Sequence, residues 1–310
     1  SGMIALHNGS LDNSSLVSLV DIFEKNHREV LVEQLALAIL AEDPQNKFAL
    51  RKLAEFYKNN NSDKVWDYYE QIVKLDLEEA DIPKILAERY EKQGNKEEAV
   101  KYYKKSLQRY EAAKNFAAVQ EVWNKLVELI PTKLEFFLQE QRKIAKTISE
   151  DKSADLMKKL YRYYKDISNW AVAISILKLI LSIDKRDGSS RAELVECYRA
   201  YYADHSHVEQ YIQSSNLEKS FRDIDEAIND FEKHIAFDVK NFVFHRTWGV
   251  GVIKKLENDT LTINFGKKNG VRDISLKMAV NALQPLAKDH IWVLKATNKK
   301  EDLAKKVKDD

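Results

Sequence analysis

Apolar residues recur every three or four positions over most of residues 1–240, which is the spacing of one face of an α-helix. Only four of the eight glycines fall in this region, and breaker clusters at 59–62 (NNNS) and 187–190 (DGSS) separate the periodic segments. The pattern therefore predicts a series of helices joined by short turns. Its last helix is expected to run unbroken from Glu218 to Asp238, with Phe221 on the apolar face.

The helical region repeats itself at a period of about 34 residues. A leucine followed four positions later by a tyrosine occurs at Leu53, 33 residues on at Leu86, and again at Leu160 and Leu194. Two short amphipathic helices and a turn need about 34 residues, and such pairs cover their apolar faces by stacking on one another. The spacing resembles the tetratricopeptide repeat, although no first helix is evident around 107–114. The alternative is an irregular helical bundle with accidental periodicity.

The periodicity changes after residue 240. Apolar and polar residues alternate over 252–256 and 261–265, as in half-buried strands, and Asn258-Asp259 between them is a hairpin signal. A further strand is predicted over 271–274 and a short helical turn over 276–283. These short strands fit a small SH3-like or Tudor-like β-barrel.

The predicted fold class is therefore mostly α, with a tetratricopeptide-like α-solenoid followed by a small SH3/Tudor-like β-barrel. The expected domains are the solenoid (3–240), the β-module (241–296) and a charged tail or linker (297–310).

The balance of basic and acidic side chains differs between these regions. Residues 241–296 hold nine basic and four acidic side chains, whereas residues 1–240 hold 36 basic and 41 acidic ones, within a chain of net charge +1. The β-module is thus the better candidate for an acidic partner or a nucleic acid. The single cysteine, Cys197, excludes an internal disulfide. No apolar stretch approaches the roughly 20 residues that span a membrane, and no signal pattern is present, so a cytoplasmic location is expected.

The most specific motif lies over 243–253. It contains Val243, His245, Trp248, Gly249 and Gly251. This segment resembles the Tudor-like module at the C-terminus of UvrD/PcrA-type helicases, with Trp248 where that family usually has Phe. CarD-like RNA polymerase-interacting domains are a looser likeness. The resemblance implies contact with RNA polymerase.

The order of the two regions resembles the N-terminal region of long-form GreA-type transcription elongation factors of spirochaetes and chlamydiae. In that family a coiled coil with an acidic tip and a polymerase-binding domain follow. This sequence stops about 14 residues after the β-module. The resemblance therefore implies an N-terminal fragment whose own role is docking.

The partner-binding residues are expected to be the aromatic and basic side chains of the β-module. These residues also have purely structural interpretations: Trp248 could fill the interior of a barrel, His245 could be a turn histidine, and the lysines could serve solubility. The glycines of the motif, Gly249 and Gly251, could supply backbone freedom. The predicted set is His245, Arg246, Trp248, Lys254, Lys255, Lys267, Lys268 and Arg272.

No catalytic residue, metal site or cofactor is predicted. The Gly249-x-Gly251 pair lacks a surrounding βαβ unit. Asp204, His205 and His207 could coordinate a metal, but an exposed helix turn is the expected explanation.

The expected function is a non-enzymatic interaction scaffold associated with bacterial transcription elongation, with the β-module docking on RNA polymerase. Two alternatives stay open: direct nucleic-acid binding by the β-module, and a generic scaffold for another cytoplasmic partner, with a peptide or protein on the concave face of the solenoid.

Overall fold

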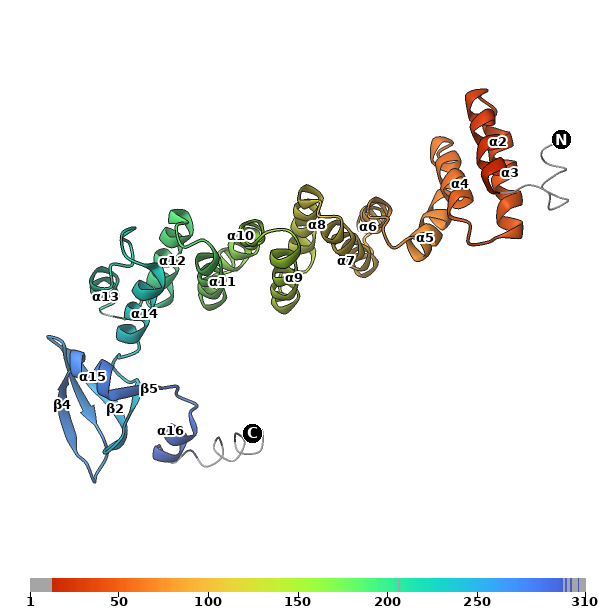
Figure 1. The fold of residues 1–310 in the computed structure, drawn as a ribbon. Coiled ribbons are helices and arrows are strands. Elements are labelled where there is room, and N and C mark those ends of the chain that lie inside the picture. Colours follow the sequence, from red (N-terminus) through yellow and green to blue (C-terminus); the bar gives the residue numbers. More distant parts are fainter. Residues whose placement is uncertain (1–12, 206, 298, 300–301, 303–305, 307–310) are drawn as a thin grey trace. The chain divides into compact units, whose positions relative to one another are not determined.

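The computed structural model describes residues 13–205, 207–297, 299, 302 and 306 (Figure 1). The predicted tail over 297–310 lies largely outside this range. The chain forms two compact units, residues 1–160 and 161–310. The helices of the first unit are α2 (Asn13–Lys25), α3 (Glu29–Glu42), α4 (Lys47–Asn59), α5 (Val65–Leu75), α6 (Asp81–Lys92), α7 (Lys96–Ala112), α8 (Phe116–Leu129) and α9 (Leu134–Thr147), and α10 (Glu150–Asp166) spans the boundary.

One turn geometry recurs between the helices, and a tyrosine near the helix end marks it. The Tyr90 carbonyl accepts the N–H of Asn95 at 2.9 Å, and Gly94 between them has a φ of +74°. The Asn95 side chain then caps α7 by accepting the N–H of Glu98. A left-handed residue after the last helical turn satisfies the free carbonyls there. The same tyrosine-to-fifth-residue bond with a positive φ in between occurs at Tyr57, Tyr110 and Tyr164.

Helix α7 takes part in two hairpins. It packs against α6 before it and α8 after it, and the turns at its two ends have the same geometry. Tyr103 in its middle donates to the Glu91 carboxylate of α6 at 2.7 Å, whereas Tyr110 marks the turn into α8. The first helix that was not evident in the sequence around 107–114 is therefore the C-terminal half of α7 itself.

The interior of the first unit is made by the apolar faces of these helices. Trp123 of α8 is fully buried, packs edge-on against Phe137 of α9 at 5.0 Å, and donates its indole N–H to the carbonyl of Leu156 at 2.9 Å. Burial of the whole indole with its polar atom satisfied confirms that this tryptophan is a core residue.

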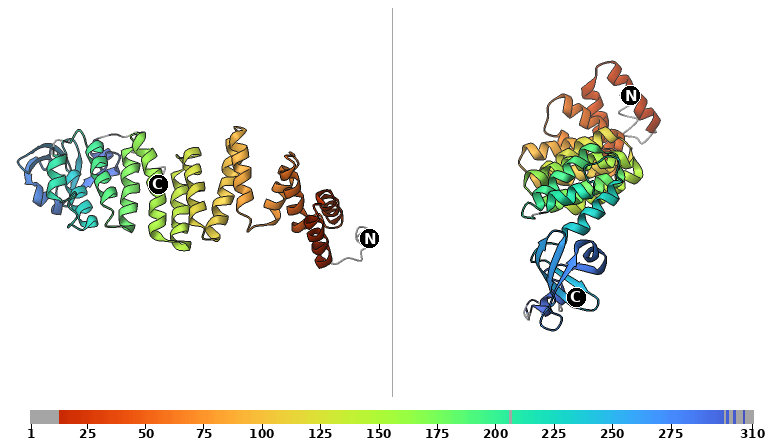
Figure 2. Two further views of the ribbon diagram at one scale, coloured as in Figure 1. Left: turned by 90° about the horizontal axis from the view of Figure 1, so that it is seen from above. Right: turned by 90° about the vertical axis from the view of Figure 1, so that its left-hand side faces the viewer.

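The second unit joins helices to a β-sheet (Figure 2, blue). None of the helices in the described part of the chain is long and apolar enough to cross a membrane. The elements after α10 are α11 (Trp170–Ile183), α12 (Gly188–Tyr201), α13 (Val208–Ser214), α14 (Ile224–Ile235), β1 (Phe242–His245), β2 (Gly249–Glu257), β3 (Thr260–Asn264), β4 (Val271–Ser275), α15 (Leu276–Ala282), β5 (Leu283–Leu286) and α16 (Ile291–Ala296).

The prediction of one helix from Glu218 to Asp238 is wrong. Helix α14 begins at Ile224, because the Asp223 side chain accepts the N–H groups of the first helical turn and fixes the start there. Phe221 lies before this cap and is 80% exposed, so it is not part of the apolar face.

Arg191 explains why the chain before α14 is not helical. Its side chain is buried, and its guanidinium donates to the main-chain carbonyls of Leu217 at 2.7 Å, Arg222 at 2.9 Å and Asn216 at 3.3 Å. These carbonyls are thereby turned toward α12 instead of along a helix axis.

The sheet is antiparallel with the strand order β4-β3-β2-β1-β5. The predicted strands and the helical turn α15 are confirmed. Asn258 and Asp259 both have positive φ, 46° and 57°, as a primed hairpin turn requires. Within the described residues the outer strands β4 and β5 do not pair with each other, so the sheet is open and the predicted closed barrel is not formed.

Candidate functional site: an aromatic–basic cluster at one end of the sheet

Two turns lie together at one end of the sheet. In the β1–β2 turn, the Nδ1 atom of His245 accepts the N–H groups of Thr247 at 3.1 Å and Trp248 at 3.3 Å. In the β3–β4 turn, the Asn269 side chain donates to the main-chain carbonyl of Trp248 at 2.9 Å. His245 is thus a turn histidine, as its structural interpretation held, and the two turns are linked into one surface.

Trp248 is the centre of this surface. Its ring stacks on the His245 imidazole with 3.8 Å between centroids and meets the Phe265 ring edge-on at 5.4 Å. The Arg272 guanidinium carbon lies 4.3 Å from the centroid of the indole. A cation over an indole face is stabilised by about 0.5–1 kcal/mol at exposed sites. Trp248 is only half-buried, so it packs on the protein and still offers part of its ring to a partner.

The two glycines of the motif have different roles. Gly249 has a φ of +74° with open space where a Cβ would be, so it supplies backbone freedom. Gly251 has no such angle, but a Cβ there would lie 2.7 Å from side-chain atoms of Ile263 and Phe265. The expectation of backbone freedom is therefore met at Gly249, whereas Gly251 is needed for close approach of the strands.

Four of the predicted basic residues lie at this same end. Arg246 belongs to the β1–β2 turn, Lys267 and Lys268 belong to the β3–β4 turn, and Arg272 follows in β4. All four side chains are exposed. Together with Trp248 they form what we call the aromatic–basic cluster: His245, Arg246, Trp248, Lys267, Lys268 and Arg272.

Lys254 and Lys255 are not part of this cluster. They lie five and six residues beyond Gly249 along β2, which corresponds to about 17–20 Å at 3.3 Å per residue. The register of β2 on β3 shifts between Ile253 and Lys255, so both lysines are exposed at an irregularity in the strand. Lys255 also forms an ion pair with Glu257 at 2.7 Å.

The expectation of an exposed helix turn at Asp204, His205 and His207 is wrong for His205. His205 is buried, its Nδ1 accepts the N–H of His207 at 3.1 Å, and its Nε2 lies 3.9 Å from the Asp238 carboxylate. Burial lowers the pKa of His205. Across the described ranges no group of three or more His, Cys, Asp or Glu side chains could hold a metal ion.

Sequence reasoning missed the residues that assemble the cluster. Phe265, directly after β3, and Asn269, in the turn that follows, support Trp248. The sheet is in turn attached to the helices of its own unit: Gln210 of α13 donates to Asp259 at 3.2 Å, and Ile253 exchanges backbone hydrogen bonds with Lys240 and Asn241. An asparagine before a glycine was the available signal for the role of Asn269, since this pair is typical of tight turns.

Comparison with known proteins gives two relatives that match along the whole chain. The chain is 48% identical over 310 residues to the "Putative GreA-associated domains protein" of Treponema pallidum (strain Nichols). It is 33% identical over 311 aligned positions to the "Transcription elongation factor GreA" of Borreliella burgdorferi. The chain spans 47% of the first relative and 34% of the second, so it corresponds to part of each. No family model matches the chain.

Solved structures give weaker likenesses. The crystal structure of the MamA protein is 14% identical and covers 73% of this chain and 95% of its own, with a TM-score of 0.28. A tetratricopeptide repeat protein from Parabacteroides merdae is 17% identical and covers 71% and 91%, with a TM-score of 0.32. These scores are too low to define the fold, which rests on the helix hairpins themselves. The chain is therefore similar, from end to end, to part of two proteins that are named for GreA.

Proposed function

We propose that this chain is a non-enzymatic interaction scaffold of transcription elongation, and that the aromatic–basic cluster docks on RNA polymerase. The observation that carries the proposal is the end-to-end similarity to proteins whose names refer to GreA. The resemblance of residues 243–253 to the polymerase-contacting module of UvrD-type helicases supports the same partner.

The geometry of the cluster suits a docking surface. Binding energy at protein interfaces is concentrated in a few residues, and tryptophan and arginine are enriched among them. Trp248 is held between His245, Phe265 and Arg272, so little side-chain freedom is lost when a partner covers it. The exposed cations around it favour an acidic surface on the partner and accelerate encounter at low salt.

Binding of the full chain to purified bacterial RNA polymerase, measured by biolayer interferometry, tests the proposal. Replacing Trp248 by alanine should weaken binding by at least about tenfold, because truncating a central anchor costs about 1.4–2 kcal/mol or more. Trp292→Ala is the matched control, since Trp292 is 45% exposed on α16 and packs at a tilt against Phe244 outside the cluster. Equal weakening by both changes, or no binding at micromolar concentration, would reject the proposed docking.

Duplex DNA is the second ligand in the same experiment. If the β-module binds nucleic acid directly, affinity for DNA should fall steeply with salt, by about 0.9 in the log–log slope for each phosphate contact. Replacing Lys254 and Lys255 by glutamate, which reverses their charge, should then abolish DNA binding. Binding of DNA in preference to polymerase would replace the docking proposal by that alternative.

A further inference from the structure

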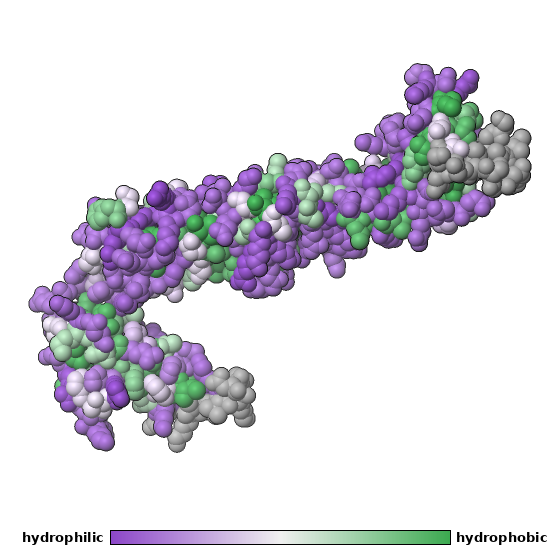
Figure 3. All heavy atoms as spheres, in the orientation of Figure 1, coloured by the Kyte–Doolittle hydropathy of each residue, from purple (hydrophilic) through white to green (hydrophobic). Residues whose placement is uncertain are grey.

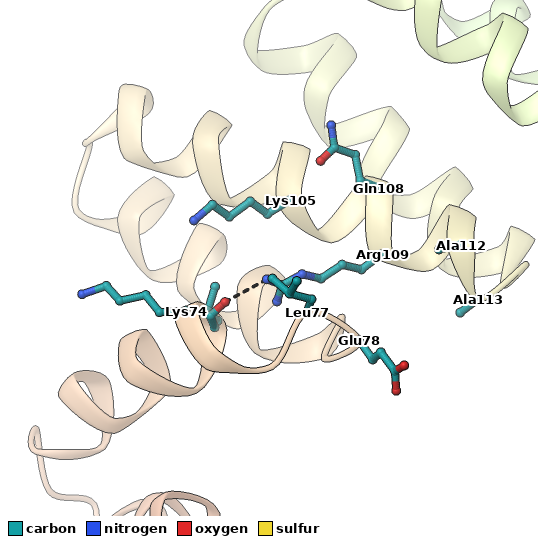
Figure 4. Close-up of a pocket in the computed structure, with 9 residues that line it drawn as sticks. Lys74, Leu77, Glu78, Lys105, Gln108, Arg109, Ala112 and Ala113 are labelled. Carbon is teal, nitrogen blue, oxygen red and sulfur yellow. Dashed lines mark hydrogen bonds between the residues drawn. The ribbon is translucent and has the colours of Figure 1, made fainter. Parts of the chain in front are cut away.

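A groove lies in the first unit, away from the aromatic–basic cluster in the sequence. Its walls are the C-terminal end of α5, the loop over residues 76–80 and one side of α7 (Figure 4), and its volume is about 910 Å³. This volume is in the upper part of the range for ligand pockets. Nothing in the function proposed above uses these residues.

Cations line the groove. Lys105 and Arg109 lie one helical turn apart on α7, and Lys74 reaches the groove from α5. Figure 4 shows the side chains of Lys74 and Lys105 extending in the same direction. Within the described part of the chain, neither lysine forms an ion pair with a carboxylate. Burial, and next the neighbouring cations Lys101 and Arg109, lower the pKa of Lys105, and Glu98 acts in the opposite direction.

The acidic residues nearby offset this charge only in part: Asp76 and Glu79 act on Arg109 against the lowering of its pKa by burial, but among the described residues neither forms an ion pair with Lys74 or Lys105. Arg51 binds the Asp76 carboxylate at 2.9 Å and the Glu79 carboxylate at 2.7 Å, which holds both acids in an ion-pair network of their own. Glu78 lines the groove, but its carboxylate points away from Lys74 and Lys105 in Figure 4. The groove therefore has a net positive charge.

An exposed leucine lies beside these cations, and the main chain holds it there. Arg109 donates to the carbonyl of Val73 at 2.8 Å and to that of Glu79 at 2.6 Å, so the loop between them is fixed to α7. Leu77 in this loop is 73% exposed, far more than the other large apolar side chains of α5 and its loop. On the face shown in Figure 3 the helices are mainly hydrophilic, and Leu77 adds an apolar contact surface beside the cations of the groove.

We propose that this groove binds an acidic segment of a partner protein, in which carboxylates meet Lys74 and Lys105 and an aliphatic side chain packs against Leu77. A phosphate backbone would satisfy the lysines but would leave Leu77 and the adjacent alanines, Ala112 and Ala113, without an apolar contact. The cations are supplied by two helices, α5 and α7, and Leu77 by a loop that Arg109 fixes to α7, so the site is formed before the partner arrives. The inference does not depend on the contact of the β-module with polymerase.

Selection of a random twelve-residue peptide library on the immobilised full chain tests the proposal. The enriched peptides should combine aspartate or glutamate with leucine, isoleucine or valine. A synthetic peptide of the enriched sequence, labelled with fluorescein, should bind the double variant Lys74→Glu/Lys105→Glu at least tenfold more weakly by fluorescence anisotropy. Leu77→Ala should weaken binding about threefold without loss of stability, because Leu77 is exposed.

The matched control is Lys92→Glu/Lys96→Glu, which makes the same charge change at exposed positions of α6 and α7 outside the groove. This variant should bind the peptide as the unaltered chain does. Enrichment of peptides without acidic residues, equal loss in both double variants, or tighter binding of a single-stranded oligonucleotide of equal charge would each overturn the proposal. Because no polymerase is present, these outcomes are independent of the docking test.

Discussion

Replacing Gly251 by alanine should destabilise the sheet through a steric conflict in its interior. The new Cβ would lie 2.7 Å from the Cγ2 atom of Ile263 and from the Cδ1 and Cε1 atoms of Phe265, whereas carbon atoms pack best at about 3.5–4.0 Å. Overpacking of this kind costs about 1–3 kcal/mol. Alanine also reduces the freedom of the unfolded chain, which offsets about 0.4–1 kcal/mol. The expected net loss is about 1–2 kcal/mol.

Native-state hydrogen exchange of peptides that cover β2 and β3 is the appropriate assay, since a chain of two units does not unfold in one step. The steric origin can be separated from a general loss of stability by a double-mutant cycle with Phe265→Leu, which replaces the ring that the Cβ would meet by a smaller aliphatic side chain. We expect a coupling of at least about 0.5 kcal/mol for Gly251 with Phe265. Gly249→Ala is the control: its cost comes from the positive φ and should not depend on residue 265. A loss below about 0.5 kcal/mol for Gly251→Ala, or no coupling, would refute the reasoning.

Three further predictions concern the helices. Arg191→Met should lower the opening free energy measured by native-state hydrogen exchange of the surrounding helix by about 3 kcal/mol, because three carbonyls lose a charged donor. Asn115→Ala removes the side chain that accepts the N–H of Ala118, and should cost about 1 kcal/mol in the same assay. The hydrogen bond from Arg51 lowers the pKa of Asp76, so its stabilising contribution should be complete above the ordinary pKa of about 4 and disappear as the pH falls through the lowered value. Hydrogen exchange of α5 should show this loss on acidification, and Asp76→Asn should remove the dependence.

Helices and strands could be predicted from the sequence because their patterns are local. The leucine–tyrosine spacing indicated the repeated helix pairs, and alternation with Asn258-Asp259 located the β2–β3 hairpin. The apolar periodicity hid the helix boundary at Ile224, although Asp223 followed by Glu226 is a local cap signal there. Arg191, about 30 residues earlier, also holds the carbonyl of Arg222 before the cap. A contact this distant leaves no mark on local periodicity.

The candidate site was predicted in part, because some of its residues are close together in the sequence. His245 and Trp248 are neighbours in a turn, and their short spacing brings them together. Lys254 and Lys255 were grouped with them on charge alone, but strand length and the register shift in β2 separate them. Leu77 is exposed because Arg109 fixes the loop that carries it. No sequence pattern predicts this contact between the loop and α7.

The double role of α7 limits how this region can change in length. In an array of separate helix pairs, one pair can be deleted and its neighbours can close the gap. Here α7 completes the hairpin with α6 and begins the hairpin with α8, so excision of either pair would leave an apolar face of the remaining helix uncovered. A homologue with a different number of helices should therefore not lose α7 together with only one of its two neighbours.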